Sequence, residues 1–458
     1  VGTFFTDPSA FSRGSGRMYR PVLLASFAAN WALSPAPWSL KLGNVLLHMA
    51  TAVLLLQWLW QLGRRLRIAT VAAGLFAVHP LASETVNLVS ARSELLCLFG
   101  LLLGLVAHAA WQRGRGSFGT LLVVLLAAVL ACGSKETGVM LPVLVLLQAV
   151  WLQPGRPLLQ AVRRALLVLV PLAVVTLAYL VARKLLLGDV AVPLLDRDGS
   201  DPTQGYGRSL AVQLATMATL LPQAVWQCVW PFGLSLDPAV HYRTTFADPQ
   251  VMSCVVLLAV ATLLGVRRGR HARLRRLGLG LAWLVALPWI VVPLNMPYAE
   301  HRMYGPLAGL AAVLAAVLPR RIVGWLPAAS GAVRGPKLVG VALPAVLLMF
   351  ACASAWRSFE YRDEEVLWRA ELAQRPDSAR ALWGIGTVRL RRGDAPGALD
   401  FLRRAHEGMP THPDMLRNYT ECLVVLPDSE ADPDTALVVA ARLLSTNPND
   451  AWTRTLLV

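Results

Sequence analysis

Charged residues are scarce in this sequence. Asp, Glu, Lys and Arg make up 15% of its 458 residues, whereas 56% are hydrophobic and the mean hydropathy is +0.53. A soluble globular domain carries about 25% charged residues, so the shortage excludes an ordinary soluble protein. Apolar runs long enough to cross a bilayer take their place, and the composition indicates a polytopic membrane protein.

Cysteine is also rare, and its spacing shows no metal-binding pattern. The six cysteines lie mostly inside apolar runs, without a CxxC pair. We therefore predict neither a disulfide framework nor a metal site, and the sequence indicates no cofactor. The chain opens on valine, without a secretory leader, so we expect further sequence upstream of Val1.

Acidic residues are few in the first part of the chain and more frequent in the last. Residues 1–355 hold 30 Lys and Arg against 11 Asp and Glu, and residues 356–458 hold 13 against 16. We predict a membrane domain over 1–355 and a soluble domain over 356–458. In the membrane part the basic residues form short clusters between apolar runs, such as RRLR (64–67) and RRGRHARLRR (267–276). This pattern assigns the net charge of +16 to membrane-surface loops, and no nucleic-acid partner is predicted.

The apolar runs predict about ten transmembrane helices. The positive-inside rule keeps the basic clusters in the cytoplasm, which is possible for all of them only if residues 188–249 form one outer loop. Within it, residues 209–230 would form an interfacial helix with Trp226 and Trp230 at headgroup depth. Every acidic residue of the membrane part then faces outward. The predicted spans are 42–62, 68–80, 93–111, 118–132, 139–153, 165–187, 250–266, 277–293, 304–318 and 338–355.

Three turns on the predicted outer side carry charges of both signs at the ends of apolar helices. One interpretation is helix capping, in which Ser93 caps a helix whose first turn carries Glu94. Capping accounts less well for Lys135, one of four lysines beside 39 arginines, because a charge at a membrane boundary is costly. The turns lie within FAVHPLASETVNLVSARSELLCLF (76–99), CGSKETG (132–138) and NMPYAEHRMYG (295–305).

Cations gathered at this depth would suit a lipid phosphate, because guanidinium forks and an ammonium bind phosphate oxygens. Glu84 and Glu136 are predicted to orient these cations or, as the weaker alternative, to act as a catalytic base. The predicted phosphate-binding residues are Arg92, Lys135, His301 and Arg302, and the predicted supporting residues are Glu94, Glu300 and Tyr304.

The last hundred residues contain a helical repeat. In ALWGIGTVRLRRGDAPGALDFLRRAHEGMP (381–410), small residues and a closing proline recur at the positions of a tetratricopeptide repeat. A second unit has Ala436 and Pro448, and the interval of twelve residues from alanine to proline occurs in both. The alternative is two unrelated helical hairpins. The insert VLPDSEADPD (425–434) is longer than the repeat allows, and we expect the array to be incomplete at Val458.

The chain resembles the transmembrane-and-tetratricopeptide-repeat protein O-mannosyltransferases and their bacterial relatives. No single matching stretch is specific, but their common order through nearly the whole chain is. The stretches are YRPVLLASFAANWAL (19–33), KLGNVLLHMATAVLL (41–55), FAVHPLASETVNLVSARSELL (76–96), SKETGVMLPVLVLL (134–147), CVWPFGLSLD (228–237), PYAEHRMYGPLAGL (297–310) and the repeat tail.

This resemblance implies a GT-C fold and transfer of a sugar, usually mannose, from a polyprenyl- or dolichyl-phosphate donor to Ser or Thr hydroxyls of a polypeptide. It also implies a catalytic acid in the first outer loop. Asp7 is a poor match for that acid, so we expect the catalytic Asp upstream of Val1. The repeat tail would recruit the polypeptide acceptor, on the periplasmic or luminal side.

Two other functions remain open from the sequence. A non-enzymatic membrane scaffold could hold the repeats on the outer surface to organise an envelope complex, and then the three charged turns need not converge. A transporter is less favoured because it places charges near the bilayer midplane rather than at helix ends. The preference for arginine over lysine points to a bacterial plasma membrane, or to the ER membrane if the source is eukaryotic.

Overall fold

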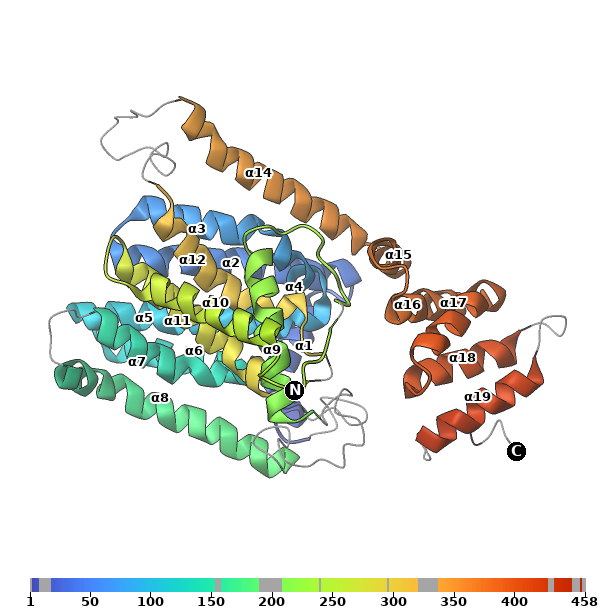
Figure 1. The fold of residues 1–458 in the computed structure, drawn as a ribbon. Coiled ribbons are helices and arrows are strands. Elements are labelled where there is room, and N and C mark those ends of the chain that lie inside the picture. The colour runs from blue at the N-terminus through green and yellow to red at the C-terminus, as the bar shows by residue number, and fades with distance from the viewer. Residues whose placement is uncertain are drawn as a thin grey trace. The chain divides into compact units, whose positions relative to one another are not determined.

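The structure is a computed structural model. It describes residues 2–7, 18–152, 158–188, 208–238, 240–294, 296–319, 337–426, 432–446 and 454. Every regular element within these residues is a helix, which confirms the predicted all-α fold class (Figure 1). Residues 189–207 of the predicted outer loop, residues 427–431 of the predicted insert and Pro448 lie outside the described residues.

Each of the ten predicted spans coincides with a helix. The helices of the first part are α1 (Pro21–Leu33), α2 (Pro37–Gly63), α3 (Leu66–Val78), α4 (Ser83–Asn87), α5 (Arg92–Ala110), α6 (Phe118–Ser134), α7 (Leu141–Leu152), α8 (Leu158–Leu187), α9 (Leu210–Gln227), α10 (Pro249–Val266), α11 (Ala272–Val291), α12 (Tyr304–Val317) and α14 (Lys337–Glu360). Short helical turns are η1 (Gly2–Phe5), η3 (Pro80–Ala82), η4 (Val89–Ala91), η5 (Trp111–Arg115), η6 (Glu136–Met140) and η8 (Glu300–Met303).

The chain divides into two compact units. Unit 1 comprises Val1–Leu234 and Val240–Ala355, and unit 2 comprises Ser235–Ala239 and Trp356–Val458. Unit 2 contains α15 (Glu364–Gln374), α16 (Ala379–Arg391), α17 (Ala395–Gly408), α18 (Pro413–Val425) and α19 (Pro433–Thr446).

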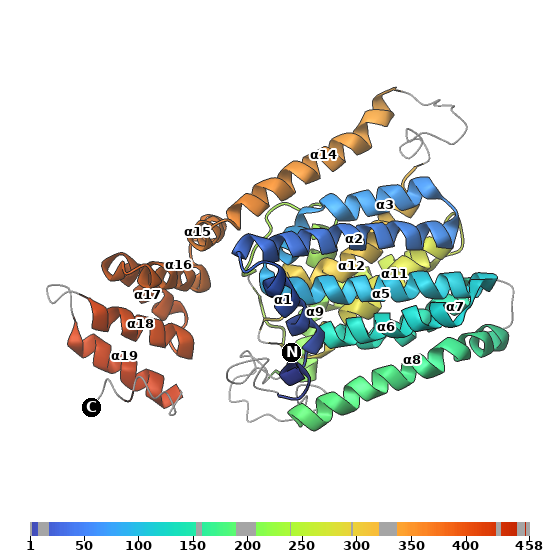
Figure 2. The same ribbon diagram turned by 180° about the vertical axis from the view of Figure 1, so that it is seen from behind.

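Unit 1 is a bundle whose apolar surface suits a bilayer. In the described part of the chain, six helices are long and apolar enough to cross a membrane, or seven if the bent pair α3 and η3–α4 is one span. The central helix α5 has 83% of its apolar window buried, against 6% for α10 and 17% for α8. Figures 1 and 2 show α8 along the outer side of α6 and α7. Exposed leucines and valines on α8 and α10 therefore provide the surface that lipid would cover.

Polar side chains inside the bundle are paired across helices. His48 of α2 contacts the Tyr304 hydroxyl through Nδ1 at 2.8 Å and the Ala77 carbonyl through Nε2 at 3.1 Å. The carbonyl can only accept, so Nε2 carries the proton and Nδ1 accepts from Tyr304. Trp58 of α2 donates to Gln148 of α7 at 2.6 Å. Such bonds fix the register of the helices, because an unpaired polar group is costly in an apolar interior.

The helices α11 and α12 approach each other closely at two glycines. A Cβ atom added at Gly278 would lie 2.6 Å from the Gly309 carbonyl oxygen, and one added at Gly309 would overlap the Gly278 carbonyl. Only glycine fits where two helix backbones come so near.

We expect Gly309→Ala to destabilise unit 1 by about 1–3 kcal/mol, because α11 and α12 would have to separate. A fluorescence melt of the detergent-purified protein measures this. The matched control is Gly119→Ala on α6, where the nearest atom to an added Cβ is Ser117 Oγ at 3.7 Å. Equal melting of the two variants would contradict the assigned helix contact.

Unit 2 is built of helical hairpins whose small residues let the helices approach. Ala398, Leu402 and Ala405 of α17 are fully buried, and a Cβ atom added at Gly386 of α16 would lie 2.6 Å from Leu402 Cγ. Gly393, with φ of +81°, forms the turn between the two helices. The small residues that the repeat pattern singled out are thus the contact positions between α16 and α17.

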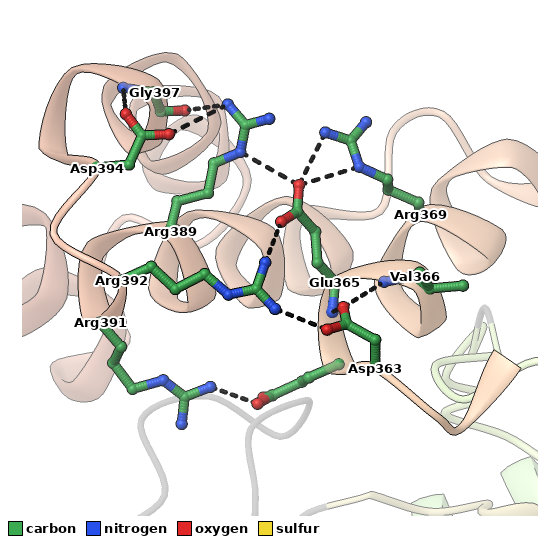
Figure 3. Close-up of polar contacts among 10 residues, drawn as sticks. Asp363, Glu365, Val366, Arg369, Arg389, Arg391, Arg392, Asp394 and Gly397 are labelled. Atoms are coloured by element: carbon green, nitrogen blue, oxygen red, sulfur yellow. Dashed lines mark hydrogen bonds and ion pairs between the residues drawn. The ribbon is translucent and has the colours of Figure 1, made fainter.

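A charge network joins α15 to the first hairpin (Figure 3). Glu365 pairs with Arg369 at 2.8 Å, with Arg389 at 3.2 Å and with Arg392 at 2.8 Å. The Val366 backbone N–H lowers the pKa of Asp363, and Arg392 adds to the effect. A lowered carboxyl pKa stabilises the fold above the ordinary aspartate pKa, and this contribution is lost as the pH falls through the acid range. Exposed pairs stabilise little one by one, so the network mainly fixes orientation.

The segment Ser235–Ala239, between α9 and α10, folds with unit 2. Ser235 Oγ donates to Glu371 Oε1 at 2.6 Å, and the Leu236 N–H donates to Glu371 Oε2 at 2.8 Å. The Glu371 side chain on α15 is buried, and these two donors satisfy both of its oxygens. The chain therefore enters unit 2 twice, once through this segment and once through the C-terminal part.

Candidate functional site

Three turns that are far apart in the sequence pack together at one end of unit 1. The turn η8 packs against η3 and α4, and η6 packs against α5. Figure 1 shows α4 and α1 at that same end. The predicted convergence of the three turns is therefore present for residues 79–94, 132–138 and 296–305, because the helices adjoining each turn end there.

The basic clusters lie at the opposite ends of these helices. The cluster 64–67 links α2 to α3, and 267–276 links α10 to α11. Arg273 Nη1 donates to the Leu62 carbonyl at 3.3 Å, so these two clusters share one end of the bundle. Charges of mixed sign thus gather at one end and basic loops at the other.

Lys135 is the centre of the charged end. Its ammonium donates to Glu94 in the first turn of α5, and the Lys135 side chain is only 14% exposed. The positive charges of Arg20 and Arg302 lie close enough to repel this ammonium. An ammonium has three N–H donors, and one contact with a carboxylate leaves the others available. Lys135 could therefore also bind an anion at this end of the bundle.

Glu136 is held by two arginines that sequence reasoning missed. Arg20, before α1, donates to Glu136 Oε2 at 2.9 Å, and Arg183, in the last turn of α8, donates to Oε1 at 3.1 Å. Both carboxylate oxygens are therefore engaged, which suits a residue that positions cations rather than one that takes a proton. Arg20 lies in a stretch already singled out, YRPVLL, whereas Arg183 stands beside Lys184 with no local signal.

Glu84 and His301 form a pair across the bundle end. Glu84 Oε1 lies 2.7 Å from His301 Nδ1, and Oε2 accepts from the His301 backbone N–H at 2.9 Å. The Glu84 side chain is 6% exposed and that of His301 26% exposed. Glu84 therefore contacts His301 through both of its carboxylate oxygens.

The structure directs Arg92 away from this cluster. Its guanidinium donates to Asn44 Oδ1 at 2.7 Å, to Asn30 Oδ1 at 3.0 Å and to the Leu40 carbonyl at 2.7 Å. Arg92 is 4% exposed and lies over the Phe27 ring. These contacts tie α5 to α1 and α2, so we assign Arg92 a structural role in place of the predicted phosphate binding.

The predicted supporting residues have separate surroundings. Glu94 holds Lys135, and Tyr304 is fully buried with its hydroxyl on His48. Glu300 is 1% exposed in η8, and Arg302 donates to the carbonyls of Met296 and Pro297. No group of three or more possible metal-ligating side chains occurs within the described residues.

Fold and site together define a multi-pass helical membrane protein with a cluster of charges of both signs at one end of its bundle and helical hairpins in a second unit. No protein-family profile matches the chain. It is 25% identical to mouse protein O-mannosyl-transferase TMTC4 over 441 residues, which cover 86% of this chain and 58% of that protein. It is also 25% identical to mouse protein O-mannosyl-transferase TMTC3 over 89% of this chain and 46% of that protein.

A nematode relative, Caenorhabditis elegans protein O-mannosyl-transferase F38B6.6, is 23% identical over 84% of this chain and 53% of its own length. The chain spans about half the length of the curated relatives it matches. It is a distant relative, at the level of the family, of the transmembrane-and-tetratricopeptide-repeat protein O-mannosyl-transferases, as the sequence resemblance predicted.

Proposed function

We propose that the protein is a membrane glycosyltransferase that moves a sugar, mannose in the first instance, from a polyprenyl- or dolichyl-phosphate donor to Ser or Thr hydroxyls of polypeptides. The names of its relatives support the protein O-mannosyltransferase role. The proposed GT-C class and lipid-linked donor follow from the resemblance together with the site.

The observation that carries the proposal is the group of cations in and around the converging turns. Around Glu94 and Glu136 the described residues place Arg20, Lys135, Arg183 and Arg302. Guanidinium and ammonium groups bind phosphate oxygens, and a site at a helix end lies at headgroup depth, so this group of cations suits a lipid-linked phosphate.

The site residues would stabilise the departing phosphate. As the bond between the sugar anomeric carbon and the phosphate oxygen breaks, negative charge grows on that phosphate, and Lys135 and Arg302 would stabilise it. Glu94 and Glu136 hold the cations in position. Lipid-linked sugar and polypeptide are the proposed partners.

The proposed orientation places the site outside. The basic loops at the opposite end would face the cytoplasm under the positive-inside rule. The site and unit 2 would then lie on the periplasmic or luminal side, where unit 2 would recruit the polypeptide acceptor. The proposed location is a bacterial plasma membrane, or the ER membrane in a eukaryote.

A donor-swap assay tests the proposal. The full-length protein in liposomes is given a Ser/Thr-rich peptide and either polyprenyl-phosphate mannose or GDP-mannose. We expect mannosyl-peptide only from the lipid-linked donor. Transfer from GDP-mannose would overturn the donor assignment, and no transfer from either would overturn the enzyme proposal in favour of the scaffold alternative.

A further inference from the structure

A buried arginine lies at the end of α11 that leads toward η8. Arg208, two residues before α9, is 0% exposed. Its guanidinium donates through Nη2 to the Leu294 carbonyl and lies over the Tyr242 ring, 5.3 Å from the centroid. The C-terminal end of a helix favours a cation, because its last carbonyl groups have no helical donors and carry partial negative charge. Arg208 therefore acts as a cap where α11 ends.

Gln213 of α9 completes this cap. Its Oε1 accepts from Arg208 Nε at 3.2 Å, which leaves its Nε2 to face α11. Nε2 donates to the Trp289 carbonyl at 3.4 Å and to the Ile290 carbonyl at 3.2 Å. In a continuing helix the Trp289 carbonyl would accept from residue 293, but Pro293 has no N–H. The Arg208–Gln213 pair therefore supplies donors that α11 itself lacks.

Stability alone does not account for a charged residue at this position. Arg208 is fully buried, yet no carboxylate pairs with it among the residues that the structure describes. A buried charge without a counter-ion costs free energy, and an apolar residue of similar volume is often as stable in its place. An apolar residue cannot reach the Leu294 carbonyl and the Gln213 amide at once, as the guanidinium does. The contacts therefore indicate a positioning role.

Two further carbonyls beyond α11 bind Arg302. Arg302, in η8, donates through Nη1 to the carbonyls of Met296 and Pro297, which closely follow Leu294 in the sequence. The charge of Arg302 is close enough to repel the Lys135 ammonium. A guanidinium follows the groups that accept its hydrogen bonds, so the place of Arg302 relative to Lys135 depends on where α11 ends.

We propose that Arg208 and Gln213 are positioning residues for sugar transfer, acting through the end of α11 on Arg302. This inference rests on the proposed function, in which Arg302 stabilises the departing phosphate. The N-terminal end of α9 fixes the C-terminal end of α11 and, with it, one cation of the site. A misplacement of about 1 Å in such a group can lower turnover about 100-fold. The pair therefore affects the transition state more than it affects binding of the donor.

The test is a double-mutant cycle on the full-length protein in liposomes, with polyprenyl-phosphate mannose and a Ser/Thr-rich peptide. We expect Arg208→Met to lower kcat about 10- to 100-fold, with the KM for the donor nearly unchanged. In an Arg302→Ala background the same substitution should lower kcat no further, because the residue through which it acts is gone.

The matched control is Arg275→Met, at the opposite end of the bundle. Arg275 also caps a helix C-terminus, donating to the Gly265 carbonyl at 3.1 Å and to the Arg267 carbonyl at 2.8 Å, at the end of α10. Loss of this cap should leave kcat at the wild-type value. A fall in kcat equal to that of Arg208→Met would show a general effect of lost capping and would overturn the assignment.

Thermal melts of the same proteins test the pair without turnover. Arg208 and Arg302 secure neighbouring carbonyls, so their losses of melting temperature should be less than additive. If Arg208→Met does not fold, Arg208→Lys replaces it in the cycle, since one ammonium cannot reach Leu294 and Gln213 together. Wild-type kcat in the Arg208 variant, a loss confined to KM, or a loss of kcat that adds to that of Arg302→Ala would each overturn the assignment. A wild-type protein that transfers no sugar would overturn the proposed function instead, and additive melts would overturn the link from Arg208 to Arg302.

Discussion

Lys135→Ala is expected to reduce mannose transfer from a polyprenyl-phosphate donor by about 100- to 1,000-fold, the usual effect of removing one preorganised group that stabilises developing charge. The Lys135 side chain is 14% exposed and is held by Glu94, so its charge acts in a partly desolvated site. The measurement is the initial rate of mannosyl-peptide formation by protein in liposomes.

Two further variants distinguish a loss of catalysis in Lys135→Ala from a loss of stability. Lys184→Ala, at an exposed position near the end of α8, is the matched control and should retain activity. Because loss of Lys135 leaves Glu94 unpaired, Lys135→Ala combined with Glu94→Ala should melt like the wild-type protein yet remain inactive. Full activity in Lys135→Ala would remove this lysine from the site.

Arg92→Ala is expected to unfold the N-terminal part of the bundle rather than to alter donor affinity. The guanidinium makes hydrogen bonds to acceptors on α1 and α2, and each bond to a charged donor contributes about 1.5–3 kcal/mol. We expect a destabilisation of about 3 kcal/mol or more. Arg92→Lys should fare little better, because a single ammonium cannot reach acceptors spread over two helices.

The measurement for Arg92 is a thermal melt in detergent with size-exclusion chromatography. Arg65→Ala, at an exposed position before α3, is the control and should melt like the wild-type protein. A normal melt of Arg92→Ala together with a raised KM for the donor would contradict the structural role. It would restore the phosphate-binding role predicted from the sequence.

Much of the fold followed from local patterns. In a membrane, only helices and closed barrels let every backbone N–H and C=O group form a hydrogen bond, so a long apolar run is expected to be helical. Each of the ten predicted runs coincides with a helix. The count of ten spans stays a prediction, because a helix such as α12 (Tyr304–Val317) has fewer than the roughly 20 residues that cross a bilayer core.

The sequence predicted which segments form the site, but not which side chains pair within it. Placing a charge in an apolar segment costs free energy unless the charge is paired, so Lys135 and Glu84 could be singled out from the sequence alone. Which charge meets which depends on contacts across more than a hundred residues, as in Arg20 with Glu136. For the same reason Arg92 could be recognised as important but not as a tie between helices.

By itself the sequence determined a helical membrane chain, basic loops at one set of helix ends, a repeat in the tail and a distant relationship to protein O-mannosyl-transferases. These depend on composition and periodicity, which act over one or two helical turns. Only the tertiary structure decided that Glu84 contacts His301 and that two arginines donate hydrogen bonds to Glu136. It also decided that Arg92 donates to backbone carbonyls and to asparagine side chains. Those outcomes depend on which helix ends meet, and that is set by packing of the whole bundle.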